Sequence, residues 1–421
     1  MRLTSLNKFA PFVLFATMIA APLVAQAQTA TPGLLLINEF RLRGPNGAND
    51  EFIEIYNSGA PHTVTASSGT GYAIVASDGV VRCTIPNGTV IPSLGYFLCV
   101  NSAGYSLASY PAGAGATATG DATYTLDIPD NAGIALFTRN TGVFLNGTPL
   151  DAVGSTAETN GVFKEGAGYP ALTPFDINYS FYRDNCGKQG AITGPGICTS
   201  VKNSFGGHPI DTNNNATDFI YVDTNGISAG AGQRLGAPGP QNSTGPHFRN
   251  QDWPSFFVDA NVSGASPPNR VRDLTSDPAN NSTFGTLSIR RRWHHFAFPV
   301  TRLRFRIVDL TTFPAPAGYA DLRARTSVSV VVGGVTDATT CAETGTPSIP
   351  PCSVTIHGTI LEQPPSQPNG GGFNSTLSAG TVTFDTPLPP GSINLQFLFG
   401  VQQTGSFRIY VNAESHIAGG Q

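Results

Sequence analysis

The stretch from Leu34 to Asn57 is the feature that most constrains the fold of this chain. Residues 34–37 form an apolar run without alternation, which is typical of a strand buried on both faces. Residues 44–50 read Gly-Pro-Asn-Gly-Ala-Asn-Asp, a composition that favours a turn and opposes a helix. In residues 51–57 isoleucines alternate with other side chains, so they occupy one face of a second strand. The stretch therefore predicts a strand pair in an all-β unit.

The composition extends this prediction to the whole chain of 421 residues. Charged residues are 12% of the sequence, and glycine (48) and proline (33) are abundant, as expected for strands joined by turns. A hydrophobic content of 40% argues against disorder. The formal net charge of −4 is unlike that of proteins that neutralise phosphates, so we expect no nucleic acid partner.

The first 27 residues have the pattern of a signal peptide. Arg2 and Lys8 supply positive charge, residues 10–24 are an apolar core, and residues 25–27 are a small-residue cleavage pattern. No later apolar run approaches the ~18 residues that cross a membrane, so we expect no transmembrane anchor. We therefore expect export to the periplasm or secretion.

Six cysteines fall into three pairs that are close in sequence: Cys83 and Cys99, Cys186 and Cys198, and Cys341 and Cys352. An even number of cysteines in an exported chain predicts disulfides, and adjacent pairing is the simplest of the possible connectivities. A metal site is the weaker interpretation, because the sequence contains no Cys-x-x-Cys and no histidine with ligand spacing.

A change of pattern along the chain predicts two β-sandwich domains, at residues 33–245 and 250–421. In the first, short apolar runs recur every ~8–12 residues, and residues 154–245 resemble loops that wrap back over the sandwich. In the second, alternation is cleaner. Residues 302–307 alternate arginines with apolar side chains, which predicts an antiparallel sheet with one buried and one wet face.

Three places in the first domain have a family likeness. They are Leu36–Phe40 with Glu51–Asn57, residues 124–151, and a last group made of Tyr179–Arg183, the Asp/Asn segment that ends in Asp218-Phe219, and the Pro-Gly-Pro-Gln-Asn exit at Pro238–Asn242. With these segments the chain resembles the lamin-tail domain (LTD) family, in the form carried by exported bacterial proteins. The likeness covers roughly residues 33–245, and the C-terminal half is unassigned. It implies an immunoglobulin-like sandwich and a binding or attachment role, although a fold alone does not fix a function.

One loop has the spacing of oxygen ligands for calcium, at Asp211, Asn213, Asn215 and Asp218. The pattern begins like an EF-hand loop, but Ala216 replaces the turn glycine and Val222 replaces the bidentate glutamate. Because Asn and Asp also form turns without metal, a metal-free turn is the alternative to a structural calcium site. No other cofactor is expected.

Residues 290–295, Arg-Arg-Arg-Trp-His-His, are the one basic and aromatic cluster. On a strand, alternate side chains share a face, so this cluster would be split between two faces. A ligand surface would form if the arginines of residues 302–306 lay beside one face of this cluster across a hairpin. The candidates for this surface are then Arg290, Arg292, His294, Arg302, Arg304 and Arg306. The alternative is a solvated sheet face.

The sequence contains no complete catalytic set. Residues 226–230 match Gly-x-Ser-x-Gly, but the glycine-rich residues that follow cannot form the required helix. Glu39, Glu51 and Glu54 are expected to be hydrogen-bonded parts of the fold rather than a glycosidase pair. We therefore expect a non-enzymatic exported protein that binds a protein or glycan ligand or organises a surface. The alternatives are an exported hydrolase of the phosphoesterase or nuclease class and a calcium-stabilised adhesin.

Overall fold

The computed structural model describes residues 33–110, 116–173, 176–184, 209, 211–249, 253–295, 298–383 and 385–417. Strands make up 42% and helices 5% of the structure, which confirms the predicted all-β class. The predicted signal peptide lies outside the described residues. In the described part of the chain, no helix is both long enough and apolar enough to cross a bilayer.

The first half contains two facing sheets. Their strands are β1 (Leu35–Arg41), β2 (Phe52–Asn57), β4 (Gly71–Ala76), β5 (Val81–Pro86), β7 (Tyr96–Asn101), β8 (Ala122–Tyr124), β9 (Ile134–Phe137), β10 (Asp151–Val153), β11 (Tyr179–Arg183) and β12 (Phe219–Asp223). One sheet has the order β12-β11-β1-β2-β7-β8 and the other β10-β9-β4-β5, while β3 (His62–Thr63) and β6 (Val90–Ile91) form a separate pair. A single core joins the sheets, with Ile37 and Ile55 from one and Ile74 and Leu136 from the other.

The opening strand pair has the predicted form, because β1 and β2 are antiparallel and Ile53 and Ile55 enter the core. The disulfide Cys83–Cys99 joins β5 to β7 and so connects the two sheets. The prediction for residues 154–245 was incomplete. β11 and β12 extend the six-stranded sheet instead of only covering it.

The second half also contains two facing sheets. Its strands are β13 (Phe248–Arg249), β14 (Ser255–Phe256), β15 (Arg270–Asp273), β16 (Thr286–His295), β17 (Val300–Leu310), β18 (Asp321–Arg325), β19 (Val330–Val335), β20 (Gly345–Thr346), β21 (Cys352–Gly358), β22 (Ile360–Leu361), β23 (Thr376–Ser378), β24 (Gly391–Gln403) and β25 (Ile409–Ile417). One sheet has the order β13-β25-β17-β23-β22, and the other has β14-β16-β24-β21-β19 with β15, β18 and β20 attached. Phe305 of β17 packs on Trp293 of β16 and Phe397 of β24 in the core between them.

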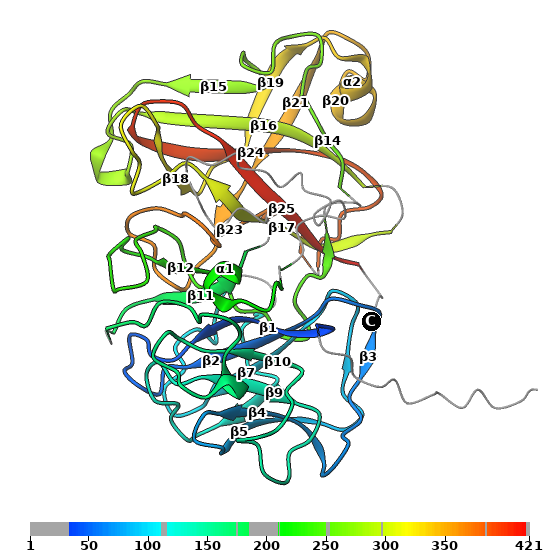
Figure 1. Ribbon diagram of the computed structural model, residues 1–421. Helices are drawn as coiled ribbons and strands as arrows, with labels where there is room; N and C mark the ends of the chain where they lie inside the picture. The colour runs from blue at the N-terminus through cyan, green and yellow to red at the C-terminus, as the bar shows by residue number, and fades with distance from the viewer. Residues whose placement is uncertain are drawn as a thin grey trace, which may run out of the picture.

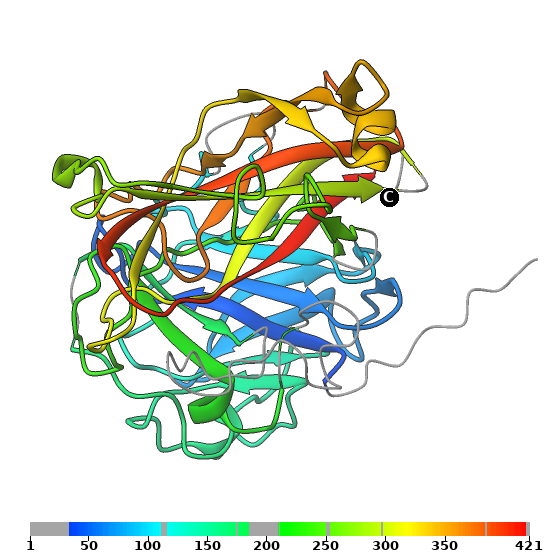
Figure 2. The same ribbon diagram turned by 90° about the horizontal axis from the view of Figure 1, so that it is seen from above.

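The four sheets are stacked as four layers (Figure 1). The six-stranded sheet of the first half lies against the five-stranded sheet of the second, so these two form the inner layers. Figure 2, seen from above, shows the long yellow-green to red strands of the second half lying over the blue strands of the first. The eight-stranded sheet is therefore an outer layer, with its α2 helix (Ala338–Thr344) at the far end of the molecule.

The junction between the inner layers is buried and charged. Glu414 of β25 accepts hydrogen bonds from Nε of Arg304 at 2.9 Å and from Nε of Arg306 at 3.0 Å. Burial alone would raise the pKa of Glu414, but the positive charges of Arg306, Arg304 and Arg249 outweigh it and lower that pKa to about 2. Glu414 is therefore ionised across the usual pH range.

The junction corrects two predictions for residues 302–306. Arg302, Arg304 and Arg306 are buried, so they are not a ligand surface and the sheet face that they occupy is not wet. They also lie on β17, in a different sheet from Arg290, Arg292 and His294 of β16. The physical reason is that the first half of the chain covers the arginine face of β17 and supplies it with hydrogen-bond partners.

A buried connecting segment, residues 235–242, runs between the two halves. The carbonyl oxygen of Gly239 accepts from Nη2 of Arg306 at 3.3 Å, and its amide donates to Oε1 of Glu39 at 2.8 Å. A Cβ atom at Gly239 would lie 2.6 Å from Nη1 of Arg306, so a larger residue would require this guanidinium group to shift. Two residues on, the amide of Gln241 donates to Oε2 of Glu54 at 2.6 Å. Glu39 and Glu54 are thus structural acceptors, as predicted.

Removing Glu414 tests the energetic weight of the junction. Glu414→Gln leaves the buried guanidinium group of Arg306 without its carboxylate and that of Arg304 with only Glu362 at 3.7 Å, and we expect the free energy of unfolding to fall by about 3–5 kcal/mol. Urea denaturation measures it. The control is Asp176→Asn, which removes an ion pair to Arg43 whose acidic side chain is 58% exposed, and should cost less than about 1 kcal/mol. Equal losses in the two variants would contradict the buried-junction account.

Glu54 provides a pH test. Burial, and then the negative charge of Glu39, raise the pKa of Glu54 to about 8. The Asn38 amide next to it donates to Oε1, yet Asn38 Oδ1 has no hydrogen-bond partner. The raised pKa indicates a neutral Glu54 carboxyl group in the folded protein at pH 7.

We therefore expect the contribution of Glu54 to stability to be complete below pH 4.5 and to be lost as the pH rises to about 8, because over that range the unfolded state has released a proton that the folded state still holds. Glu54→Gln cannot ionise, so its stability relative to wild type should rise between pH 6 and pH 9, as measured by urea denaturation at each pH. A difference that does not change with pH would refute the neutral state.

Candidate functional site

An open cleft of about 620 Å³ lies at the edge of the eight-stranded sheet. Arg291, Arg292 and His294 of β16 line it from the sheet. Phe256 and Phe257 line it from the adjoining strand and loop, and these rings remain 43% and 39% exposed. The cleft therefore combines positive charge with accessible aromatic surface.

The cleft exists because two strands share one edge of β16. β14 pairs with Arg292 and Trp293, whereas β15 pairs with Thr286–Ile289, so the edge is not covered by a strand between these positions. Residues 257–269 leave the sheet at that gap. Within this loop Asp259 accepts a hydrogen bond from the amide of Thr336 at 2.7 Å, which ties the loop to the segment before α2.

Each phenylalanine is paired with an arginine. The guanidinium carbon of Arg292 lies 4.8 Å from the ring centre of Phe256, and that of Arg291 lies 4.8 Å from the ring centre of Phe257. Such cation–π contacts hold both partners in a fixed orientation. The lining of the cleft is therefore preorganised.

The opposite wall is formed by Asp337, the residue that caps α2, and by Thr339 and Glu343 of α2. A helix of seven residues is too short to be stable alone. The disulfide Cys341–Cys352 attaches α2 to β21, as the sequence predicted, and its sulfur atoms lie in a small core with Val335 and Ile356. The third predicted pair, Cys186 and Cys198, lies outside the described residues.

A polar contact at Ser392 separates this cleft from a second hollow of about 290 Å³. Ser392 Oγ donates to Oε2 of Glu343 at 2.5 Å and lies 2.9 Å from Nδ1 of His294. Arg292 also forms an ion pair with Glu343. In a catalytic triad the acid lies on the histidine nitrogen remote from the serine, whereas Glu343 and Ser392 lie on the same nitrogen. The contact is thus a wall between two hollows rather than a serine nucleophile site.

The predicted basic candidates of β16 divide between two positions. Arg292 and His294 line the cleft, whereas Arg290 lies further along the strand and donates to Oε1 of Gln396 at 3.2 Å. Arg291 was not among the predicted candidates, because alternation assigned it to the opposite face. It reaches the cleft through the uncovered strand edge, for which the sequence carries no signal.

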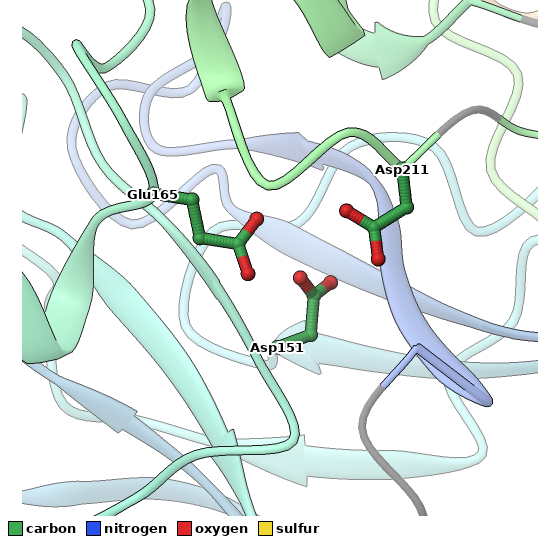
Figure 3. A group of neighbouring side chains, drawn as sticks. All are labelled: Asp151, Glu165 and Asp211. Atoms are coloured by element: carbon green, nitrogen blue, oxygen red, sulfur yellow. The ribbon is translucent and has the colours of Figure 1, made fainter.

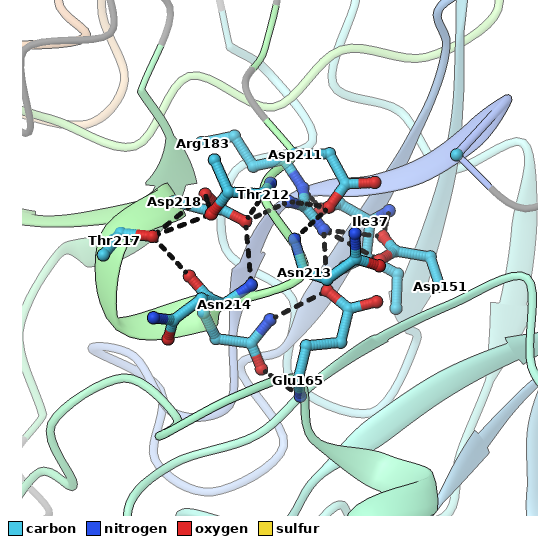
Figure 4. Close-up of polar contacts among 12 residues, drawn as sticks. Ile37, Asp151, Glu165, Arg183, Asp211, Thr212, Asn213, Asn214, Thr217 and Asp218 are labelled. Carbon is cyan, nitrogen blue, oxygen red and sulfur yellow. Dashed lines mark hydrogen bonds and ion pairs between the residues drawn. The ribbon is translucent and has the colours of Figure 1, made fainter.

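A second group of charged residues lies in the first half. The carboxyl groups of Asp151, Glu165 and Asp211 point toward one another, with oxygen atoms within 4.8 Å (Figure 3). Arg183 lies among them and forms ion pairs with Asp151 at 2.8 Å and with Asp218 at 3.3 Å (Figure 4). Burial and then the charge of Asp151 raise the pKa of Glu165 to about 8. The three oxygens could hold a cation, but Arg183 already supplies positive charge.

The predicted calcium loop is arranged mainly as a turn. Asn215 Oδ1 accepts from the amides of Gly154 and Glu165, each at 3.0 Å. Asp218 is held by Arg183 and by the amide of Thr212 at 2.9 Å (Figure 4).

Of the predicted ligands, only Asp211 belongs to the acidic group. Asn213 has the left-handed φ of 56° that suits a turn, and its amide donates to Asp211 Oδ1 at 3.1 Å. Calcium binding at these residues remains a prediction from the sequence.

Comparisons with known proteins give no identification. No family model matches the chain, and no curated protein or solved structure matches it either. The likeness to the lamin-tail domain therefore remains a prediction from the sequence.

The disulfide under α2 gives a testable expectation. In the double variant Cys341→Ala/Cys352→Ala we expect the free energy of unfolding to fall by about 2–4 kcal/mol and the α2 amides to exchange hydrogen faster, because the constraint on the unfolded chain and the anchor of the helix are both lost. Hydrogen exchange by mass spectrometry measures this. Cys83→Ala/Cys99→Ala is the matched control, and faster α2 exchange in that control as well would contradict a local role.

Proposed function

We propose that this chain is an exported, non-catalytic binding protein that holds a glycan in the cleft between β14, β16 and α2. The observation that carries the proposal is the pairing of two exposed phenylalanine rings with arginines, next to Ser255, Thr339 and Glu343 as hydrogen-bonding groups. A sugar presents apolar C–H faces and many hydroxyl groups, and this mixture of aromatic and polar side chains is complementary to both.

Two further features support an extracellular location. The disulfides Cys83–Cys99 and Cys341–Cys352 indicate an oxidising environment. The predicted signal peptide would deliver the chain to it. A lamin-tail-like first domain would then act as a rigid attachment unit, with the ligand cleft on the outer layer of the second half.

The alternative is an exported hydrolase. The observation that favours a hydrolase is the contact of Ser392 with His294 and Glu343, which are the residue types of a catalytic triad. Ser392 and Glu343 both lie on Nδ1 of His294, whereas an activated serine needs its acid on the other histidine nitrogen, so the geometry argues against a serine nucleophile. A binding protein is therefore the better-supported function.

The test is a titration of the folded protein against a panel of oligosaccharides. Phe256→Ala/Phe257→Ala should weaken binding about tenfold or more, because the stacking surface is lost. The control is Phe284→Ala, a ring 49% exposed that lines neither hollow. The absence of any oligosaccharide ligand, or unchanged affinity in the double variant, would overturn the proposal. Turnover of a bound oligosaccharide would favour the hydrolase.

A further inference from the structure

The charges in the cleft are paired except at Arg291. Arg292 is paired with Glu343. Asp337 is occupied as the cap of α2, where its Oδ1 accepts from the amide of Thr340 at 2.6 Å. In the part of the chain that the structure describes, Arg291 has no carboxylate partner. The cleft therefore holds one positive charge that no acid among the described residues pairs with.

The guanidinium group of Arg291 is fixed on one side and open on the other. Its Nη1 donates to the carbonyl oxygens of Arg290 at 2.8 Å and Asn269 at 3.5 Å, and its carbon lies over Phe257. Among the described residues, Nε and Nη2 have no hydrogen-bond acceptor. These two nitrogens form the edge with parallel N–H groups that binds an oxyanion in a bidentate manner.

The electrostatics agree with this geometry. Burial and then the positive charge of Arg270 lower the pKa of Arg291. A bound oxyanion would therefore supply a counter-charge that the described residues do not.

A second hollow, lined by hydroxyl and other polar groups, lies on the other side of the Ser392 contact. Among the residues that line it are Thr344, Thr355, His357, Thr386, Ser392 and Asn394. Because Ser392 contacts Glu343 and His294 of the first cleft, the two hollows lie on either side of one contact. An extended ligand with hydroxyl groups would bridge them.

We infer that the ligand is an acidic oligosaccharide, whose carboxylate or sulfate group binds the Nε and Nη2 edge of Arg291 while a neighbouring sugar occupies the second hollow. The inference rests on the proposed glycan-binding function and names its ligand class. Nucleic acid does not fit, because the chain has a net charge of −4 and the cleft offers a single unpaired cation for phosphates.

The experiment is isothermal titration of the folded protein with a uronic acid oligosaccharide, with its carboxyl-reduced neutral counterpart and with a sulfated neutral oligosaccharide. Wild type should bind at least one acidic ligand about tenfold to a hundredfold more tightly than the neutral one, the range of one charge-assisted contact. Arg291→Gln should abolish this preference, so that acidic and neutral ligands bind equally, with any loss from the released Phe257 ring shared by both. Arg291→Lys keeps the positive charge but lacks the two parallel N–H groups of the guanidinium edge. It should therefore retain only part of the preference for the acidic ligand.

Arg272→Gln on β15 is the control, because Arg272 carries the same charge on the adjacent strand, does not line the cleft and should leave every affinity unchanged. A preference for either acidic ligand that disappears in Arg291→Gln supports the inference and identifies the oxyanion. Equal affinity for acidic and neutral ligands, or a preference that persists in Arg291→Gln, overturns it. If the inference is overturned but the neutral oligosaccharide still binds and its binding requires Phe256 and Phe257, the proposed glycan-binding function still holds. Failure of every oligosaccharide to bind overturns both.

Discussion

The contact of Glu414 with Arg304 and Arg306 is the interaction on which the rest of the architecture depends. These charges lie between two sheets, and an ion pair removed from water is favourable only if its remaining donors find acceptors. The acceptors come from both halves, since Arg306 also bonds Asn374 and the carbonyl oxygen of Gly239. Neither half of the chain alone supplies all the hydrogen-bond acceptors that these arginines use.

The junction also explains how the outer layer is supported. β17 uses its arginine face for the junction and its opposite face, with Leu303, Phe305 and Ile307, for the core under the eight-stranded sheet. That sheet carries β16 and, through the disulfide, α2, so the two sides of the cleft are fixed to one rigid base. The proposed binding site thus lies on a rigid sheet scaffold, which allows fixed Arg–Phe pairs to define its shape.

Local pattern was enough to predict much of the fold. The β class and the strand pair β1–β2 follow from periodicity and turn residues, which act over a few positions. Two disulfide pairs follow from cysteine spacing. Residues 302–307 were misread for a physical reason: alternation separates two faces, but it cannot tell water from a second domain as the environment of the charged face. Charged side chains that face a neighbouring sheet alternate with apolar residues in the sequence in the same way as charged side chains that face water.

The candidate site was harder to predict than the fold. Arg292 and His294 followed from the basic cluster, but Arg291 enters the cleft only because β14 and β15 pair with separate parts of one strand edge. Phe256 and Glu343 lie about ninety residues apart in sequence and meet Arg292 through long-range pairing. In the Asp211–Asp218 loop, Asn215 accepts hydrogen bonds from backbone amides and Asp218 pairs with Arg183, and the spacing that predicted oxygen ligands did not predict these contacts.

Differential scanning calorimetry tests the central claim, which is that the two halves form one cooperative unit through their buried ionic junction. The account predicts a single transition whose calorimetric and van't Hoff enthalpies agree, since separating the halves would expose the buried arginines of β17 and break the hydrogen bonds from Arg306 to Gly239 and from Asn374 to Glu39. Two resolved transitions, or a calorimetric enthalpy well above the van't Hoff value, would contradict it.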